Sequence, residues 1–214
     1  MRQNRSLRQA LPDYIPQAAV DPIADWFDVN NVRLKISRDR QSKLGDFRAS
    51  CKGRLAAISV NHNLNQFSFL VTLLHEMAHA NVYLNIKKRV APHGNEWKHA
   101  FRELAVPYVQ NGLFPEDIAV AFTRYLKNPA ASSTSFLPLA NALRQYDDGN
   151  TAGITVSMIG PESLFSYGKG KTFRMVAKVR KRYRCYCLDD KKTYLFSPLA
   201  TITPINDLKT GTVH

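Results

Sequence analysis

Two histidines four residues apart, His75 and His79, and the glutamate after the first of them, Glu76, are the residues most suited to chemistry in this sequence. They lie in an apolar run, residues 67–84, which contains no Pro or Gly and predicts a buried helix. Residues four apart project from the same face of a helix, so both imidazoles could bind one metal ion. Glu76 would then stand beside a water bound to that metal. Two metal-free core histidines are the alternative, but a buried stripe of two His and one Glu needs polar partners, which a metal would supply.

A catalytic zinc site takes three protein ligands and keeps one position open for water. We favour His93 as the third ligand, because the following Gly94 lets the backbone approach closely and a second expected helix begins there. His99 is the rival, and an acidic third ligand, Glu96 or Glu103, is a further alternative.

The pattern His-Glu-x-x-His predicts a zinc-dependent hydrolase. Zinc is the expected cofactor, one ion per chain, with His75, His79 and His93 as ligands. Glu76 is the expected catalytic residue, which takes a proton from the activated water and passes it to the leaving amine. The predicted reaction is hydrolysis of a peptide bond. The motif defines an activated water and not what it attacks, so a zinc hydrolase of a non-protein substrate stays open.

Several regular elements are expected around these residues. Asp21 and Pro22 predict a helix start, with Asp21 as N-cap, and this helix should end near Asn30. The expected strands are residues 32–37, 46–50 and 55–60, and the later helices are residues 95–108, 115–125 and 137–146. Pro, Ala, Ser and Thr make residues 129–135 a candidate linker, and the sequence after residue 150 has all-β character.

Composition narrows the class of protein. The 214 residues are 44% hydrophobic and 22% charged, and no run approaches the roughly 20 apolar residues that span a bilayer. The N-terminus lacks the apolar core of a signal peptide, so the expected location is cytoplasmic. The cysteines, Cys51, Cys185 and Cys187, are too few for a disulfide framework or a structural zinc site, and we expect the last two to be buried apolar residues.

The formal net charge of +13 favours polyanionic partners, nucleic acid first. Residues 169–184 contain eight Lys and Arg and no acid. As one strand, they would place apolar residues on one face and cations on the other. The predicted nucleic-acid-binding residues are Arg174, Lys178, Arg180, Arg182 and Arg184. The alternative is an ordinary edge strand whose charges prevent aggregation.

Four blocks of the sequence resemble the SprT-like metalloprotease family, which includes bacterial SprT proteins and the eukaryotic protease Spartan. The blocks are Lys43-Leu-Gly45, Ile58-Ser-Val-Asn61, the run from Thr72 to Ala80, and His93-Gly94 with Trp97. The resemblance covers roughly residues 12 to 127. It implies a compact zincin-like domain with helices against a small sheet, three histidine ligands and a catalytic glutamate. Spartan proteins degrade proteins crosslinked to DNA and are activated by DNA, so the resemblance implies DNA, single-stranded or damaged, and DNA-bound proteins as partners.

The resemblance fails at the C-terminal end. Many relatives carry a zinc ribbon built on two Cys-x-x-Cys knuckles, whereas residues 172–205 hold only Cys185 and Cys187, with a hairpin turn expected at Asp189–Lys192. A degenerate ribbon without its metal is the expectation, so DNA contact by a ribbon does not carry over.

The predicted fold class is α+β, a helical zincin-like domain with a small sheet followed by a small all-β module. The predicted domains are 1–128 for the SprT-like domain, 129–150 for a linker and short helix, and 151–214 for the basic β-hairpin module. The leading functional hypothesis is a DNA-associated zinc endopeptidase. The alternative is a nucleic-acid-binding or transcription-associated factor in which the zinc site is structural or vestigial.

Overall fold

The computed structural model describes residues 6–40, 43–132, 135–147, 153–168 and 170–205. Internal contacts divide the chain into two units, Met1–Asp147 and Asp148–His214. Helices and two separate sheets make up the described residues, so the predicted α+β class is confirmed. Parts of the expected linker and short helix over 129–150, residues 133–134 and 148–150, lie outside the described residues, as does Lys169 of the basic segment.

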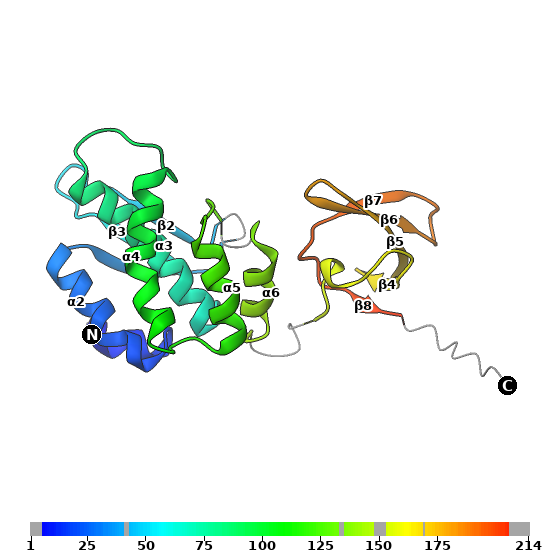
Figure 1. The fold of residues 1–214 in the computed structure, drawn as a ribbon, viewed down its shortest axis with the longest axis horizontal. Helices are drawn as coiled ribbons and strands as arrows, with labels where there is room; N and C mark the ends of the chain where they lie inside the picture. The colour runs from blue at the N-terminus through cyan, green and yellow to red at the C-terminus, as the bar shows by residue number, and fades with distance from the viewer. Residues whose placement is uncertain (1–5, 41–42, 133–134, 148–152, 169, 206–214) are drawn as a thin grey trace. The chain divides into compact units, whose positions relative to one another are not determined.

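The first unit combines a small mixed sheet with a set of helices (Figure 1). Its helices are α1 (Leu7–Ala10), α2 (Val20–Asn30), α3 (Gln66–Asn85), α4 (Asn95–Gln110), α5 (Glu116–Leu126) and α6 (Leu137–Arg144). Its strands are β1 (Arg33–Ser37), β2 (Gly45–Arg48) and β3 (Ala57–Asn61), in the order β1-β3-β2. Strand β1 runs parallel to β3 and β2 runs antiparallel to it, which leaves β2 as an edge strand.

Helix α3 is the centre of this unit. Asn65 is its N-cap, and the Asn65 side chain accepts hydrogen bonds from the backbone N–H groups of Phe67 and Ser68, as expected where a helix leaves its first N–H groups unpaired. The helix packs against β2 and β3 on one side and against α4 on another, and its apolar residues are almost all buried. The expected buried helix over residues 67–84 is confirmed.

The other helices of the first unit lie close to their expected positions. The prediction that Asp21 is the N-cap is wrong, because α2 begins at Val20 and Ala19 is its N-cap. Asp21 lies in the first turn, where its negative charge interacts favourably with the helix dipole. Helix α6, in the expected linker region, packs against α5 and buries Leu139 and Leu143 in the core of the first unit. Among the described residues, none of the helices combines the length and apolar character needed to cross a membrane.

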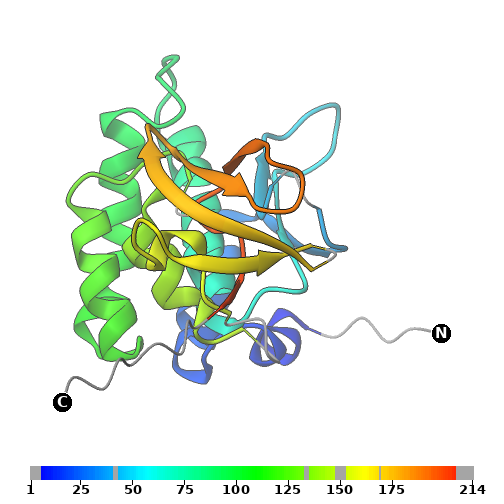
Figure 2. The ribbon, with the colours of Figure 1, turned by 90° about the vertical axis from the view of Figure 1, so that its right-hand side faces the viewer.

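The second unit is a five-stranded antiparallel sheet in the order β7-β6-β5-β4-β8, whose twisted strands are seen in Figure 2. The strands are β4 (Leu164–Tyr167), β5 (Lys171–Val179), β6 (Arg182–Cys187), β7 (Thr193–Phe196) and β8 (Thr203–Pro204). One face carries the apolar core of this unit, which includes Phe165, Phe173, Met175, Cys185 and Cys187. The turn expected at Asp189–Lys192 lies between β6 and β7.

The prediction of a single basic strand over residues 169–184 is wrong. The chain turns back at Arg180 and Lys181, with Arg180 in the left-handed region at φ 53°, so the segment forms a hairpin of β5 and β6. The pairing register also shifts between Met175 and Ala177, which is a β-bulge. A bulge adds one residue to a strand and reverses which face the later side chains occupy. The alternation of the sequence therefore breaks at Val176.

Candidate active site

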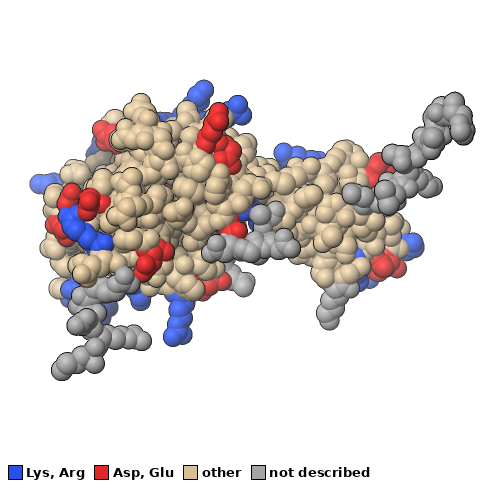
Figure 3. Space-filling view, turned by 90° about the horizontal axis from the view of Figure 1, so that it is seen from below, with Lys and Arg blue, Asp and Glu red and all other residues tan. Residues whose placement is uncertain are grey.

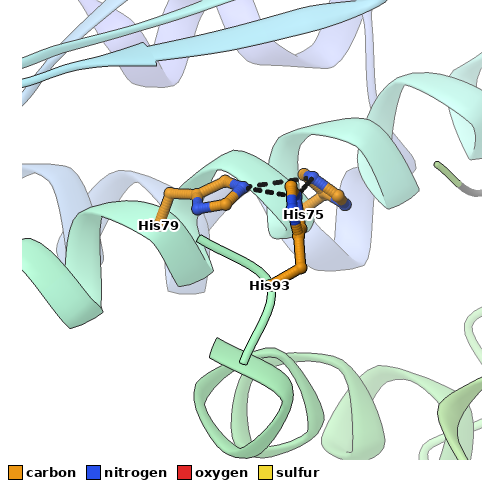
Figure 4. A group of neighbouring side chains, drawn as sticks. All are labelled: His75, His79 and His93. Carbon is orange, nitrogen blue, oxygen red and sulfur yellow. Dashed lines mark hydrogen bonds between the residues drawn. The ribbon is translucent and has the colours of Figure 1, made fainter. Parts of the chain in front are cut away.

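Three histidine side chains from two elements converge in the first unit (Figure 4). His75 and His79 lie one turn apart on α3, and His93 lies in the loop just before Gly94, the N-cap of α4. The Nε2 atoms are 3.3 Å apart for His75 and His79, 3.0 Å for His79 and His93, and 3.3 Å for His93 and His75. These three are the group of His, Cys, Asp and Glu that could hold a metal among the residues that the structure describes.

The spacing of these nitrogens fits a zinc ion. Three nitrogens bound at about 2.0–2.1 Å to a tetrahedral zinc lie roughly 3.3–3.4 Å from one another. The observed separations of 3.0 to 3.3 Å are close to that value. Three imidazole acceptors directed at one point would repel one another without a cation or protons between them, so the donor set itself favours a cation. With three protein ligands, a zinc ion bound here would have its fourth position available for water or substrate, as catalytic zinc sites require.

The electrostatic surroundings keep the histidines neutral, which metal binding requires. Burial, followed by repulsion from His79 and His93, lowers the pKa of His75 to about 3. Burial and then His93 lower the pKa of His79 to about 4, and burial lowers the pKa of His93. Trp97 holds this cluster from the α4 side, because its fully buried indole packs on all three imidazoles and its Nε1 donates to the His75 carbonyl oxygen at 3.3 Å.

The rival third ligands lie elsewhere. His99 is exposed on α4 and pairs with Glu103, with 3.2 Å between Nε2 and Oε1. Glu96, in the first turn of α4, is not part of the histidine group. His93 is thus the residue that the structure brings to His75 and His79.

Glu76 points toward the edge strand of the sheet. Its side chain is buried, and burial followed by the nearby charge of Asp46 raises the pKa of Glu76 to about 7, although a hydrogen bond from the Phe47 backbone N–H opposes the shift. A cation on the three histidines would lower this pKa again. A carboxylate next to the metal site can accept a proton and return it, which is what a general base and acid must do.

Gly45 is required for this placement of Glu76. A Cβ atom added at Gly45 would lie 2.8 Å from Glu76 Cγ, Glu76 Oε1 and Thr72 Cγ2, closer than real Cβ contacts. The first residue of β2 therefore has to be glycine for the strand to pass over α3 at this point. The resemblance included Gly45, but only the structure shows what the missing side chain permits.

Asn61 fixes the chain that leads into β2. Its fully buried side chain donates to the carbonyl oxygens of Arg40 and Lys43, both at 3.1 Å, and accepts from Arg40 Nε at 2.8 Å and Ser37 Oγ at 3.2 Å. The Asn61 backbone N–H donates to the Leu44 carbonyl oxygen at 2.9 Å. The sequence pattern places Asn61 only at the end of a strand. No signal in the sequence shows that Asn61 bonds to Arg40, Lys43 and Leu44 and so holds the chain just before β2.

Two connected hollows surround the histidines and Glu76. One, of about 320 Å³, is lined by the three histidines, Glu76 and residues 45–47 of β2. The second, of about 200 Å³, shares Gly45, His75 and Glu76 with the first and extends between Leu44, Thr72 and Ser132. The metal-binding nitrogens thus open onto a cleft with room for a chain beside the edge strand β2.

The predicted nucleic-acid-binding residues are only partly brought together. Arg174 pairs in register with Tyr186, so it shares one face of the second sheet with Arg182 and Arg184. Lys178 is on the opposite face, paired with Tyr183 and 6.0 Å from its ring centroid, and Arg180 lies in the turn. The prediction that all five cations share one face is therefore wrong, because the bulge reverses the alternation.

The cations of this face also have an acid nearby. Glu162 pairs with Arg174 at 3.4 Å, and the Arg174 guanidinium lies 5.8 Å from the centre of the Tyr186 ring. In the described part of the chain, Arg182 and Arg184 have no ion pair. The cationic face is thus smaller than the sequence predicted, and these two arginines are its free charges.

Cys185 and Cys187 are fully buried in the core of the second unit, as expected. Burial raises the pKa of the Cys185 thiol to about 11, which keeps it protonated. They lie in a core with aromatic rings, and the Cys187 thiol also donates to Asp189 Oδ2 at 3.9 Å.

Comparison with known proteins bears on the first unit. No curated protein and no solved structure matches the chain. A sequence model of the SprT-like family matches residues 17–114. These residues include the β1-β3-β2 sheet, α3, the three histidines and α4, so the match contains the whole histidine cluster. The family resemblance drawn from the sequence is confirmed by this match over residues 17–114.

Proposed function

We propose that this protein is a zinc-dependent endopeptidase whose first unit has a zincin-like active site. The observation that carries the proposal is the convergence of His75, His79 and His93 at zinc-like separations, next to the buried carboxyl group of Glu76. The SprT-like family is associated with zinc metalloproteases, which agrees with this donor set.

In this mechanism the chain's own residues bind, orient and move protons. The three neutral imidazoles would hold a zinc ion, and Trp97 packs on all three of them. When bound, zinc supplies a Lewis acid for the substrate carbonyl and lowers the pKa of water. Glu76 accepts a proton on its carboxylate from the attacking water and donates it to the nitrogen of the leaving amine.

The edge strand β2 suits an extended peptide. Among the described strands, β2 pairs with β3 alone, and its residues Gly45, Asp46 and Phe47 line the hollow that contains the histidines. An extended peptide can add to such an edge through backbone hydrogen bonds, which favours cleavage within a chain of unrelated sequence. We place the substrate backbone along β2, with the bond to be cleaved beside Glu76.

The proposed substrates are proteins bound or crosslinked to DNA. The net charge of +13 and the free arginines Arg182 and Arg184 on the second unit support a DNA partner. A nucleic-acid-binding factor with a structural zinc site is the second candidate. The same cationic face supports it, but it leaves the buried carboxyl of Glu76 without a role.

The decisive experiment compares wild type with Glu76→Gln, after each protein is shown to hold one zinc. Cleavage of a protein–DNA crosslink, and self-cleavage, are measured with and without single-stranded DNA. We expect DNA-dependent cleavage by wild type and a loss of about 10²–10⁴-fold in the variant, because the amide cannot accept the proton. His99→Ala, on the exposed face of α4, is the matched control and should cleave like wild type.

Each outcome separates the candidates. Equal cleavage by Glu76→Gln and wild type would reject the role of Glu76. One bound zinc without proteolysis under any DNA condition would favour the binding factor or a hydrolase of another substrate. Cleavage that does not depend on DNA would retain the peptidase and reject DNA-bound proteins as its particular substrates.

A further inference from the structure

A third hollow of the first unit lies on the sheet face directed away from α3. Ile58 and Val60 of β3 are buried on the α3 side, so Ala57 and Ser59 face the other way. Lys35 on β1 and Asp46 on β2 pair in register with Ser59 and share this outer face. The hollow has a volume of about 190 Å³ and is lined by Lys35, Ser37, Arg40, Arg48, Ala57, Ile58 and Ser59. Three cations and two hydroxyl groups thus border one small concave site.

Arg40 is held rigidly at this hollow. Its Nε donates to the buried Asn61 side chain at 2.8 Å, its Nη1 to Ser59 Oγ at 3.2 Å and its Nη2 to the Ser59 carbonyl oxygen at 3.5 Å. A guanidinium group has five N–H donors, so two are left for a ligand. The oxygen atoms of Asn61 and Ser59 that accept these hydrogen bonds are not ionised, so they do not neutralise the positive charge of Arg40. A preorganised arginine loses little side-chain entropy when it binds an anion.

The charge around the hollow is strongly positive. Residues 33–61 contain eight Lys and Arg against two acids, Asp39 and Asp46. Asp39 is exposed in the loop after β1. Asp46 is shared by two cations, at 2.7 Å from Lys43 Nζ and 3.0 Å from Arg48 Nε. Lys35 has no ion pair among the described residues, and neither has Arg40. The outer face therefore has uncompensated positive charge.

The arrangement of cations favours a polymeric anion. Arg33 and Lys35 are two residues apart on β1, so their side chains leave the same face about 7 Å apart and continue the charge of the hollow along the strand. A single small anion would need only the hollow, whereas a chain of phosphates would use the row as well. Elsewhere on the first unit, the face drawn in Figure 3 shows Lys and Arg scattered among Asp and Glu.

We propose that the outer face of the β1-β3-β2 sheet binds the phosphodiester backbone of a nucleic acid, with one phosphate in the hollow between Lys35, Arg40 and Arg48. This site is separate from the histidine cluster and from the arginines of the second unit. It does not require peptide hydrolysis. Because Asn61 bonds both to Arg40 and to the chain entering β2, an occupied hollow also stabilises the segment that passes Glu76.

The test measures binding of a labelled single strand of about 20 nucleotides by fluorescence anisotropy at several salt concentrations. The full chain is used in the Glu76→Gln background, so that self-cleavage cannot consume it. Lys35→Gln/Arg48→Gln is the test variant, and Arg124→Gln/Lys127→Gln, which removes two exposed charges at the end of α5, is the matched control. Arg182→Gln/Arg184→Gln measures the share of the second unit.

Lys35→Gln/Arg48→Gln is expected to raise Kd roughly tenfold and to reduce the slope of log K against log salt by about 1.4, since each phosphate contact with a single strand contributes about 0.7. The α5 control should leave both Kd and the salt slope near their wild-type values. If Lys35→Gln/Arg48→Gln changed Kd and the slope no more than the control does, the proposal would be overturned.

Lys35→Gln alone replaces the double variant if the double variant loses zinc or has a lowered melting temperature. Lys35 is exposed and has no ion pair among the described residues, so its removal leaves the fold intact. The single variant should reduce the slope by about 0.7, half the change expected for two contacts. A slope equal to that of wild type would overturn the proposal.

A competition arm distinguishes the source of the phosphate. Unlabelled strand and inorganic phosphate are compared at the same total phosphate concentration. The strand should compete far better, because it occupies the row as well as the hollow. Equal competition would show a site for a small free anion and would overturn the nucleic-acid proposal.

Discussion

Two pairs of side chains whose types can bind metals, His75/His79 on α3 and Cys185/Cys187 on β6, have opposite surroundings. Each pair lies on one face of its own element and is largely shielded from water. The histidines meet His93 from a different element, and their Nε2 atoms point at a common centre. The cysteines belong to no group of three possible metal ligands among the described residues, and they lie in an apolar core in which the Cys187 thiol contacts Asp189 Oδ2.

The difference shows what spacing can and cannot predict. The period of a helix or a strand determines that two ligands share a face. A metal site needs in addition a ligand from elsewhere and a position open to solvent. His93 and the hollow beside β2 provide both for the histidine pair. The packed core around Cys185 and Cys187 provides neither, and those thiols contribute as apolar side chains.

The largest expected effect is on zinc content. His79→Ala removes one of three ligands and should weaken zinc binding by at least about 10²-fold. Removing a residue that only hydrogen-bonds to a metal ligand already lowers metal affinity about 10–100-fold. The double variant Cys185→Ala/Cys187→Ala should retain one zinc per chain. Zinc per protein, measured by elemental analysis after dialysis, checks both.

His99→Ala is the control for the histidine variant, because His99 is an exposed residue of α4 outside the cluster. Loss of zinc from the double cysteine variant but not from His79→Ala would reverse the comparison and place the metal in the second unit. Loss of zinc from both His79→Ala and the double cysteine variant would indicate that the metal site depends on both units.

A smaller effect is expected from Gly45→Ala. The added methyl would lie 2.8 Å from atoms of Glu76 and Thr72, so either the strand or the carboxylate must shift. Misplacement by about 1 Å can lower a catalytic rate about 10²-fold, while the imidazoles on the other side of the cleft keep their positions. We expect peptidase activity to fall by about that factor with zinc retained.

Gly160→Ala is the matched control for Gly45→Ala, because a Cβ atom at Gly160 meets nothing within 4 Å. It should leave activity unchanged. Full activity in Gly45→Ala would contradict the close approach of β2 to Glu76. Loss of zinc together with activity would show that β2 supports the metal ligands and not only the carboxylate.

Much of the first unit could be predicted because its signals are local. The apolar run around His75 and Glu76 predicts a buried helix, and Gly94 with Asn95 predicts the next one, so the histidine set follows from spacing and chain order. The contribution of β2 could not be predicted. Whether Gly45 touches Glu76, or Asn61 bonds to Arg40, depends on how segments distant in sequence pack, and no periodicity encodes it.

The second unit shows how one residue can interrupt a periodic pattern. Phe173 and Met175 follow the expected alternation, and then the bulge near Val176 reverses it, so Lys178 joins the face of Tyr183. The residues around Val176 contain no Gly or Pro that would mark a bulge or a turn. The tight turn is made by Arg180 and Lys181, which turn propensities do not favour there. Charge alone therefore suggested one long strand.

The smallest expected effect concerns the thiols. At pH 8 only Cys51, which is exposed, should react rapidly with a thiol reagent, while Cys185 and Cys187 should react only after unfolding. Cys51→Ser should then show no rapid reaction. Rapid labelling of two or three thiols in the folded wild type would mean that the core of the second unit opens readily and that its cysteines are available for chemistry.

The same burial predicts an alkaline loss of stability. Because burial raises the pKa of Cys185 from 9.0 to about 11, the unfolded state loses the thiol proton first as the pH rises. Between these values the unfolded chain binds fewer protons than the folded one, so the free energy of unfolding falls with pH, by about 1 kcal/mol from pH 8 to 10. Urea unfolding at the two pH values measures this fall in wild type and in Cys185→Ala. The free energy of unfolding of Cys185→Ala should fall less than that of wild type, since the variant lacks the titrating thiol. An equal fall in both proteins would assign the effect to other residues and would contradict the raised pKa of Cys185.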